Sequence, residues 1–250
     1  MRRSWGAGWR ADRVLPAVGF GCLGRPAPES SRVRTGRAAR LAVTLVLAAL
    51  AACGGKIPPT SYYVLDLPAP EAKPPDALPY TAVVMPFRGS EMLLQDRIVY
   101  RESPSQVGFY EYHRWAEDPR TTILRSLLNQ LRANGAFDRV VPFEGRTNVD
   151  YVIRGRLEQL EEIDYGGSVT VQVKVSAQLI DAGTNRPVWS DTAEATGPVS
   201  NAEVRAVVEQ MSSAVRTAVS RLAEGINTHL RSTAAQSAPS STRSAPGEQR

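Results

Sequence analysis

The sequence is poor in the residues from which catalytic and metal sites are usually built. It has two histidines, His113 and His229, and two cysteines, Cys22 and Cys53. A zinc site needs three or four protein ligands, so we expect no metal site. The chain also lacks a Gly-x-Ser-x-Gly nucleophile motif and a Walker loop for nucleotide phosphates. We therefore expect a protein that is not an enzyme and that has no catalytic residues and no cofactor.

The sequence also has no apolar run long enough to cross a membrane. Its most apolar segment, residues 41–52, would rise about 18 Å as a helix, against about 30 Å of hydrocarbon in a bilayer. Three arginines precede this segment and small residues close it, which is typical of an export signal. The segment ends in Leu50-Ala51-Ala52-Cys53, which resembles the bacterial lipobox. The alternatives are a plain signal peptide or a buried helix that happens to end in cysteine.

The lipobox interpretation makes Cys53 the lipidated first residue of the mature chain. Stable membrane anchoring requires two signals, and the palmitate-type acyl chains on this residue would supply more than two. The protein would therefore sit on a membrane and face the periplasm. Gly54 in place of Asp resembles the class sorted to the outer membrane, so we expect the outer membrane rather than the inner one. Residues 1–52 would be a long signal peptide. Two explanations are open: translation starts at a downstream codon such as Val33, or the N-terminal part of the signal is extended.

Positive charge is concentrated in the part predicted to be removed. Residues 1–52 carry nine arginines and two acids, so 21 basic and 23 acidic residues remain of the 30 and 25 in the whole chain. The mature chain is therefore slightly acidic, which argues against nucleic acid as a partner. Cys22 is removed with the signal, so no disulfide is expected.

Proline content and polarity divide the mature chain. Residues 67–79 hold five prolines and should form an extended crossing, so 53–79 would comprise the lipidated N-terminus, a first strand at 62–67 and this crossing. Residues 80–231 would form one periplasmic α+β domain, with strand 62–67 belonging to it. Residues 232–250 are polar and predicted to be a disordered tail.

Hydrophobic periodicity predicts the elements of this domain. Residues 169–179 alternate apolar and polar side chains, which is typical of a half-buried antiparallel strand. Asp118-Pro119 should open a helix that ends at Asn134-Gly135, and a capping box of Ser200 and Glu203 should open a second helix of about 28 residues. Further strands are expected at 82–87, 97–102, 108–115, 137–143, 151–163 and 187–195. We predict an α+β fold, with a mostly antiparallel or mixed sheet and two main helices packed on it.

Several short motifs follow one another in a familiar order. Between the lipobox and the Pro-rich crossing lies Tyr62-Tyr63-Val64-Leu65. After the crossing come four more motifs: Arg97-Ile98-Val99-Tyr100-Arg101, Tyr110-Glu111-Tyr112-His113-Arg114-Trp115, Tyr151-Val152-Ile153-Arg154-Gly155 and Val188-Trp189. Over roughly residues 53–230 the chain resembles the ABC-type transport auxiliary lipoproteins. The resemblance implies a non-catalytic component that assists an ABC permease, an ATPase and an MCE protein in moving lipid between membranes. A general outer-membrane or cell-envelope assembly scaffold is the alternative.

The aromatic segment 109–115 is the best candidate for a binding site, because Tyr, Trp and Arg are enriched at interfaces. Alternation along a strand puts Tyr110, Tyr112 and Arg114 on one face, and we expect that face to contact a partner protein or a second copy of the chain. For Phe109 and Trp115 on the other face we expect core packing.

Two other features have simpler interpretations. Trp189 should pack against a helix. The acidic run Glu158, Glu161, Glu162 and Asp164 should be a solvated sheet edge rather than an acid–base pair or a calcium site.

Overall fold

The computed structural model describes residues 58–71, 76–145, 148–201 and 203–237. The predicted signal peptide, Cys53, residues 72–75 of the predicted crossing and residues 238–250 of the predicted tail lie outside the described residues. In chain order, the elements are β1 (Ser61–Tyr63), β2 (Thr81–Val84), β3 (Arg88–Gly89), the 3-10 helix η1 (Glu91–Leu94), β4 (Arg97–Ser103), β5 (Gln106–Trp115), α2 (Pro119–Ala133), β6 (Arg139–Pro142), β7 (Tyr151–Tyr165), β8 (Ser168–Asp181), β9 (Arg186–Pro198) and α3 (Val204–Ser237).

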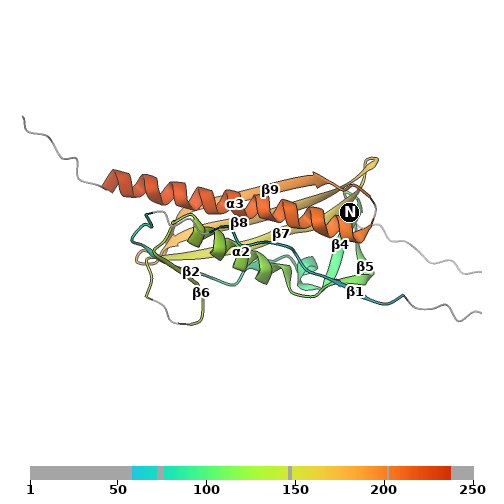
Figure 1. Ribbon diagram of the computed structural model, residues 1–250, viewed down its shortest axis with the longest axis horizontal. Coiled ribbons are helices and arrows are strands. Elements are labelled where there is room, and N and C mark those ends of the chain that lie inside the picture. Colours follow the sequence, from blue (N-terminus) through green and yellow to red (C-terminus); the bar gives the residue numbers. More distant parts are fainter. Residues whose placement is uncertain (1–57, 72–75, 146–147, 202, 238–250) are drawn as a thin grey trace, which may run out of the picture. The chain divides into compact units, whose positions relative to one another are not determined.

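The strands form one mixed sheet with the long strand β7 near its middle. On one side β7 pairs with antiparallel β8, which pairs in turn with antiparallel β9. On the other side β7 pairs successively with β2, β3 and β4, all of them parallel to it. β6 joins β2, β5 joins β4, and β1 joins β5. Nine strands and two main helices confirm the predicted α+β fold with a mixed sheet (Figure 1).

The alternation in β8 matches its burial. Val171, Val173, Val175 and Leu179 are fully buried, whereas the polar residues between them are exposed or half-buried. β8 has a long strand on each side, so its backbone hydrogen bonds are satisfied and only its two faces differ in environment. The odd-numbered face therefore belongs to the core, as the sequence predicts.

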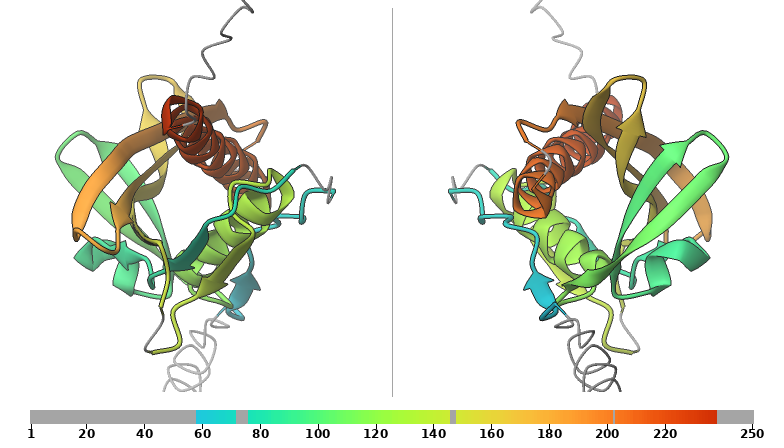
Figure 2. Two further views of the ribbon diagram at one scale, coloured as in Figure 1. Left: turned by 90° about the vertical axis from the view of Figure 1, so that its left-hand side faces the viewer. Right: turned by 90° about the vertical axis from the view of Figure 1, so that its right-hand side faces the viewer.

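Both main helices lie on the same face of the sheet (Figure 2). α3 contacts β8, β9 and α2, and its apolar stripe is buried there. The end of α2 is tied to α3 because the Asn134 side-chain amide donates to the Ala223 carbonyl (2.9 Å). The Trp189 ring of β9 lies directly against Gly225 of α3, where an added Cβ would come within 2.7 Å of it. Trp189 thus packs against a helix, as predicted.

The ends of α2 are those expected from local sequence. Asp118 is its N-cap, and its carboxylate accepts the backbone N–H of Arg120 (2.9 Å) with Pro119 in the first turn. The helix ends at Asn134, and Gly135 follows with a φ of 67°, which glycine adopts without strain. Short-range rules are sufficient here because every group involved lies within one turn of the helix end.

α3 differs from the prediction at both ends. It extends to Ser237, so residues 232–237 of the predicted disordered tail are helical. Hydroxyls of Thr233 and Ser237 donate to carbonyls four residues earlier, which satisfies acceptors along this exposed end. At the start, the Asn201 side-chain oxygen accepts the Glu203 backbone N–H (3.0 Å), in place of the predicted capping box of Ser200 and Glu203.

The first strand is shorter than expected but the segment after it still packs. Pairing covers only Ser61–Tyr63, against a predicted strand over 62–67. Leu65 is buried beyond it, and the Asp66 backbone N–H donates to the Ser212 hydroxyl of α3 (3.0 Å). The extended segment is therefore held by the helix rather than by a neighbouring strand.

Candidate functional site

The structure describes the predicted contact face on β5 but does not describe the predicted anchor, Cys53. Cys53 lies outside the described residues, so its lipidation remains a prediction. Among the described residues, no helix is both long and apolar enough to span a bilayer. The aromatic segment of β5 is described in full, and it shows where Tyr110, Tyr112 and Arg114 lie.

The predicted face of β5 is divided by an irregularity in its pairing. Val99 of β4 lies opposite Phe109, but Arg97 lies opposite Arg114, so β5 has extra residues between these pairs. A β-bulge of this kind breaks the alternation of side chains. Tyr110 and His113, predicted on opposite faces, contact each other with ring centroids 5.5 Å apart. The simple alternation expected for Tyr110, Tyr112 and Arg114 is therefore interrupted, and their contact with a partner stays a prediction.

Tyr110 belongs to an internal cluster. Its ring contacts Tyr100 with centroids 5.0 Å apart, and its hydroxyl donates to the Glu162 carboxylate of β7 (2.8 Å). Burial, together with this hydrogen bond, raises the pKa of Tyr110 above its ordinary value. On the far side of the cluster, the Tyr63 hydroxyl lies 3.0 Å from His113 Nδ1. The cluster joins β1, β4, β5 and β7 through aromatic rings and one carboxylate.

The acidic run of β7 is not a solvated edge. Glu161 is 2% exposed and Glu162 is 4% exposed, whereas Asp164 is exposed. Parallel pairing with β4 places Val99 beside Glu161 and Tyr100 beside Glu162, so this end of β7 is an interior strand and not an edge. Sequence could not show this pairing, because β4 lies about sixty residues earlier and nothing local signals it.

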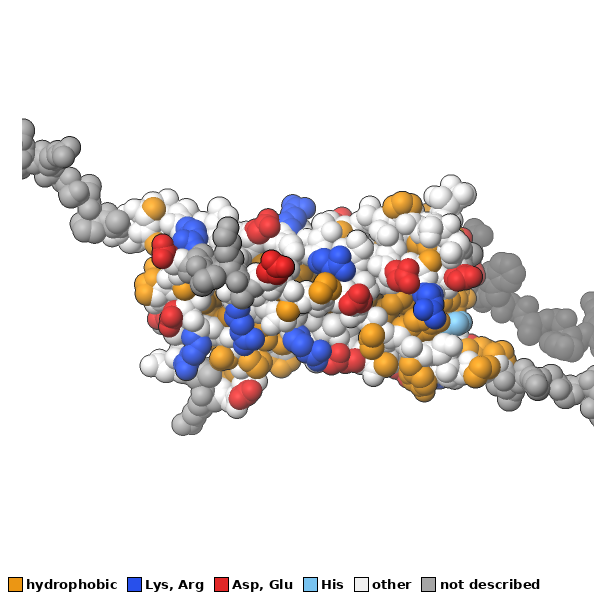
Figure 3. All heavy atoms as spheres, in the orientation of Figure 1, with side chains coloured by type: hydrophobic (Ala, Val, Ile, Leu, Met, Phe, Trp, Pro, Cys, Tyr) orange, Lys and Arg blue, Asp and Glu red, His pale blue; other side chains and the backbone are white. Residues whose placement is uncertain are grey.

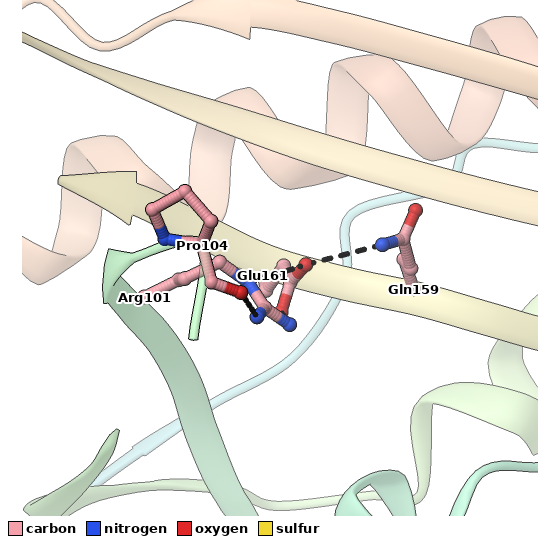
Figure 4. A network of polar contacts seen from close by, with 4 residues as sticks. All are labelled: Arg101, Pro104, Gln159 and Glu161. Atoms are coloured by element: carbon pink, nitrogen blue, oxygen red, sulfur yellow. Dashed lines mark hydrogen bonds and ion pairs between the residues drawn. The ribbon is translucent and has the colours of Figure 1, made fainter. Parts of the chain in front are cut away.

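The two buried carboxylates have different partners. Glu161 accepts from Arg101 Nε (3.2 Å) and Nη2 (2.9 Å), while Gln159 donates to it at 3.3 Å (Figure 4). Arg101 also donates to the Pro104 carbonyl at the β4–β5 turn (3.1 Å), which fixes the hairpin to β7. Glu162 accepts from Tyr110, and burial, with a smaller effect from Asp164, raises its pKa. Both acids are satisfied within the fold.

The surface beside this cluster is exposed and partly aromatic. Tyr62 is 64% exposed and lies opposite Arg114 in the parallel pairing of β1 with β5. Arg114 pairs with Asp96 (2.7 Å), and Asp96 also lines a hollow of about 240 Å³ with Trp115. Sequence reasoning missed Tyr62, although only one residue of the Tyr62-Tyr63 pair can face the core. Tyr112 lies on the same strand as Arg114 and is half-buried. We call Tyr62, Tyr112 and Arg114 the β1–β5 surface.

Hydrophobic side chains gather around this end of the molecule on the face shown in Figure 3, whereas acidic and basic side chains are mixed over the helices. Val64, two residues beyond Tyr62, is 56% exposed. Trp115, by contrast, is buried and Phe109 packs against the core, as predicted. Within the described ranges, no group of three or more His, Cys, Asp or Glu residues is placed to hold a metal ion.

Comparison with known proteins agrees with this fold. A crystal structure of protein XCC0632 from Xanthomonas campestris, of family DUF330, superposes with a TM-score of 0.62 at 17% identity, covering 71% of this chain and 99% of that one. A second crystal structure, of an uncharacterised protein, superposes with a TM-score of 0.54 at 15% identity, covering 68% and 99%. At these identities the likeness shows the fold alone.

Sequence comparison is more specific about family. No curated protein matches the chain at a significant level. A family model described as the ABC-type transport auxiliary lipoprotein component matches residues 63–226, which span the whole sheet from Tyr63 of β1 onward, α2 and most of α3. The match covers well over half of the sequence, so the chain belongs to the ABC-type transport auxiliary lipoprotein component family.

Proposed function

We propose that this chain is a lipoprotein anchored through Cys53, facing the periplasm, that acts as a non-catalytic auxiliary component of an ABC/MCE-type intermembrane lipid transport system. The observation that carries the proposal is the family match over residues 63–226. The family is an auxiliary transport component, which supports association with the cell envelope and with a transporter. The MCE system, the periplasmic orientation and the outer membrane are the finer parts of the proposal.

The chemistry of the buried acids supports a binding role rather than a catalytic one. Glu161 is held by Arg101, and Glu162 accepts from Tyr110. A general acid or base has to reach a substrate proton, and it is usually found in a cleft. These two carboxylates are instead almost fully covered by β4 and β5. Their hydrogen bonds stabilise the docking of the β4–β5 hairpin on the sheet.

The β1–β5 surface is where we propose that the transporter docks. Tyr62 and Arg114 are neighbours there, and exposed tyrosine and arginine are typical of interface residues. Seven residues lie between Cys53 and Ser61, so the eight steps of the chain span at most about 29 Å. A lipid on Cys53 would keep this surface close to a membrane, where a permease or an MCE protein could reach it.

The partner test is purification of the tagged full-length protein from native membranes, followed by mass spectrometry. We expect an MCE protein, a permease and an ATPase to co-purify. Replacing Tyr62, Tyr112 and Arg114 together by Ala should reduce their yield, whereas Tyr165→Ala, at an exposed tyrosine of the β7–β8 turn, should not. Recovery of outer-membrane assembly proteins in place of transporter subunits would support the alternative of a general envelope scaffold.

The anchor has a separate test. Intact-mass analysis of the membrane-extracted protein should show a chain that begins at Cys53 and carries acyl groups. Cys53→Ser should give unprocessed precursor or a soluble form. Density-gradient separation of the two membranes should place the wild-type protein in the outer-membrane fraction, and an unmodified Cys53 in the native protein would refute the anchor.

A further inference from the structure

A polar hollow lies on the face of the sheet opposite the helices. It has a volume of about 590 Å³ and is half open, and residues of β3, β7, β8 and β9 line it. The pairing register places Arg156, Ser176 and Thr192 in one row across the sheet. Arg154, Gln178 and Ser190 form the next row. Both rows alternate with small buried residues such as Ala177 and Ala193, whose side chains face the helices.

Three arginines meet in this hollow. Arg88 of β3 lies directly opposite Arg156 of β7 in the parallel pairing, and Arg154 is two residues away on the same face. Like charges placed opposite each other in a sheet are destabilising. All three side chains are exposed, and none of them makes an ion pair or a side-chain hydrogen bond within the described part of the chain. Among the described residues, no ion pair therefore offsets the repulsion among these three arginines.

Two acids also line the hollow, but each has another neighbour. Lys174 pairs with Glu194, which is the main cause of the raised pKa of that ammonium group, and Glu158 adds a smaller contribution. Asp191 accepts the backbone N–H of Thr192 (2.7 Å). By contrast, Arg101, Arg114, Arg120 and Arg125 elsewhere in the molecule each pair with a carboxylate. In the hollow three arginines thus outnumber two acids, and none of the three forms an ion pair within the described part of the chain.

The neighbouring strands β8 and β9 supply neutral donors. Ser176, Ser190 and Thr192 line the hollow with their hydroxyls, and Gln178 adds a side-chain amide. Guanidinium groups bind phosphate and carboxylate with two parallel hydrogen bonds, and hydroxyls can donate to the remaining oxygens. The volume lies within the range of small-ligand sites. A tetrahedral phosphate group, with several oxygens at once, uses the arginine and hydroxyl donors together better than a planar carboxylate does.

We propose that this hollow binds a phosphate-bearing anion, held by Arg88, Arg154 and Arg156 of β3 and β7 and by the serine and threonine hydroxyls of β8 and β9. A phospholipid head group and a free phosphate ester share this chemistry. The site lies on another part of the sheet than the β1–β5 surface, and it requires neither the anchor nor a transporter partner.

Calorimetric titration of the full-length protein in an uncharged detergent tests the site. The probes are dihexanoyl phosphatidylglycerol and inorganic phosphate, each at two salt concentrations. The double variant Arg88→Gln/Arg156→Gln should weaken binding at least about tenfold, because two charged hydrogen-bond donors are lost. Arg221→Gln, at an exposed arginine of α3, is the matched control and should leave binding unchanged. The melting temperature of the double variant should not fall, because the change relieves like-charge repulsion.

The outcomes separate the sources of phosphate. Binding of the short-chain phospholipid alone supports a lipid head group as ligand, and binding of inorganic phosphate alone supports a free ester. Binding of both supports the shared phosphate chemistry. The proposal is overturned if neither probe binds, or if the double variant binds both probes as the wild type does. If the tagged wild-type protein binds phosphate but co-purifies with no transporter subunit, the result counts against the proposed function and still supports this site.

Discussion

The pair formed by Arg101 and Glu161 allows a sharp test of how the β4–β5 hairpin is held on the sheet. Glu161 is 2% exposed and receives two of its hydrogen bonds from Arg101. Removing one partner of a buried ion pair costs about 3–5 kcal/mol, because the other charge is left buried. The Arg101 side chain is still 17% exposed, and Gln159 remains as a donor to Glu161, so we expect a loss near the lower end.

The perturbation is Arg101→Met, which keeps much of the side-chain volume and removes the charge. We expect the free energy of unfolding to fall by about 3 kcal/mol. For a domain of this size that corresponds to a melting temperature about 6–12 °C lower. Circular dichroism during thermal unfolding and a denaturant titration would both measure it. The double variant Arg101→Met/Glu161→Leu should recover most of the loss, since an apolar pair replaces the buried ions.

Arg114→Met is the matched control. Its pair with Asp96 is more exposed, with 30% and 53% of the two side chains accessible, so its loss should cost about 1 kcal/mol or less. Equal melting temperatures for Arg101→Met and Arg114→Met would refute the reasoning, because they would mean that Glu161 is solvated. A double variant less stable than Arg101→Met would refute it as well.

Three further changes test the core and the buried acid. Val173→Asp should unfold the domain or destabilise it by several kcal/mol, whereas Gln172→Asp should be mild, and equal melts of the two would show that the faces of β8 are misassigned. Gly155→Ala should cost about 1–3 kcal/mol, because a Cβ there would lie 2.1 Å from the Phe87 ring, and Phe87→Leu in the same chain should restore part of the loss in a denaturant titration. The pKa of Glu162 is higher in the folded state than in the unfolded state, so Glu162 loses its proton at lower pH in the unfolded chain. As the pH rises from the unfolded-state pKa to the folded-state pKa, this residue therefore lowers the free energy of unfolding. Glu162→Gln should therefore gain melting temperature relative to wild type between acid and neutral pH, and a constant difference across that range would contradict the shift.

The β4–β5 hairpin connects the buried acids of β7 with the β1–β5 surface. Arg101 and Tyr110 attach it to the two buried acids of β7. The same strand β5 then carries Arg114 out to the surface beside Tyr62. A surface built on rigid strands keeps its geometry without a ligand, which agrees with the docking role that we propose for the β1–β5 surface.

Local sequence was sufficient where the responsible groups lie close together along the chain. The alternation of β8 predicted its buried face, because side chains of a strand repeat every two residues. Asp118, Pro119 and Gly135 predicted both ends of α2, because capping involves residues within one turn. The α+β class and the family resemblance followed from the order of such elements and motifs.

Tertiary structure alone decided the features that depend on distant pairing. β4 lies parallel to the end of β7 and buries Glu161 and Glu162, which looked like a solvated edge in isolation. The irregular pairing of β5 turns Tyr110 inward to Glu162 and leaves Arg114 outside. Likewise, Arg88 meets Arg156 only because β3 pairs with β7. The burial of a side chain and the charges next to it depend on contacts between strands that are tens of residues apart in the sequence. A local sequence pattern does not show which strands will pair.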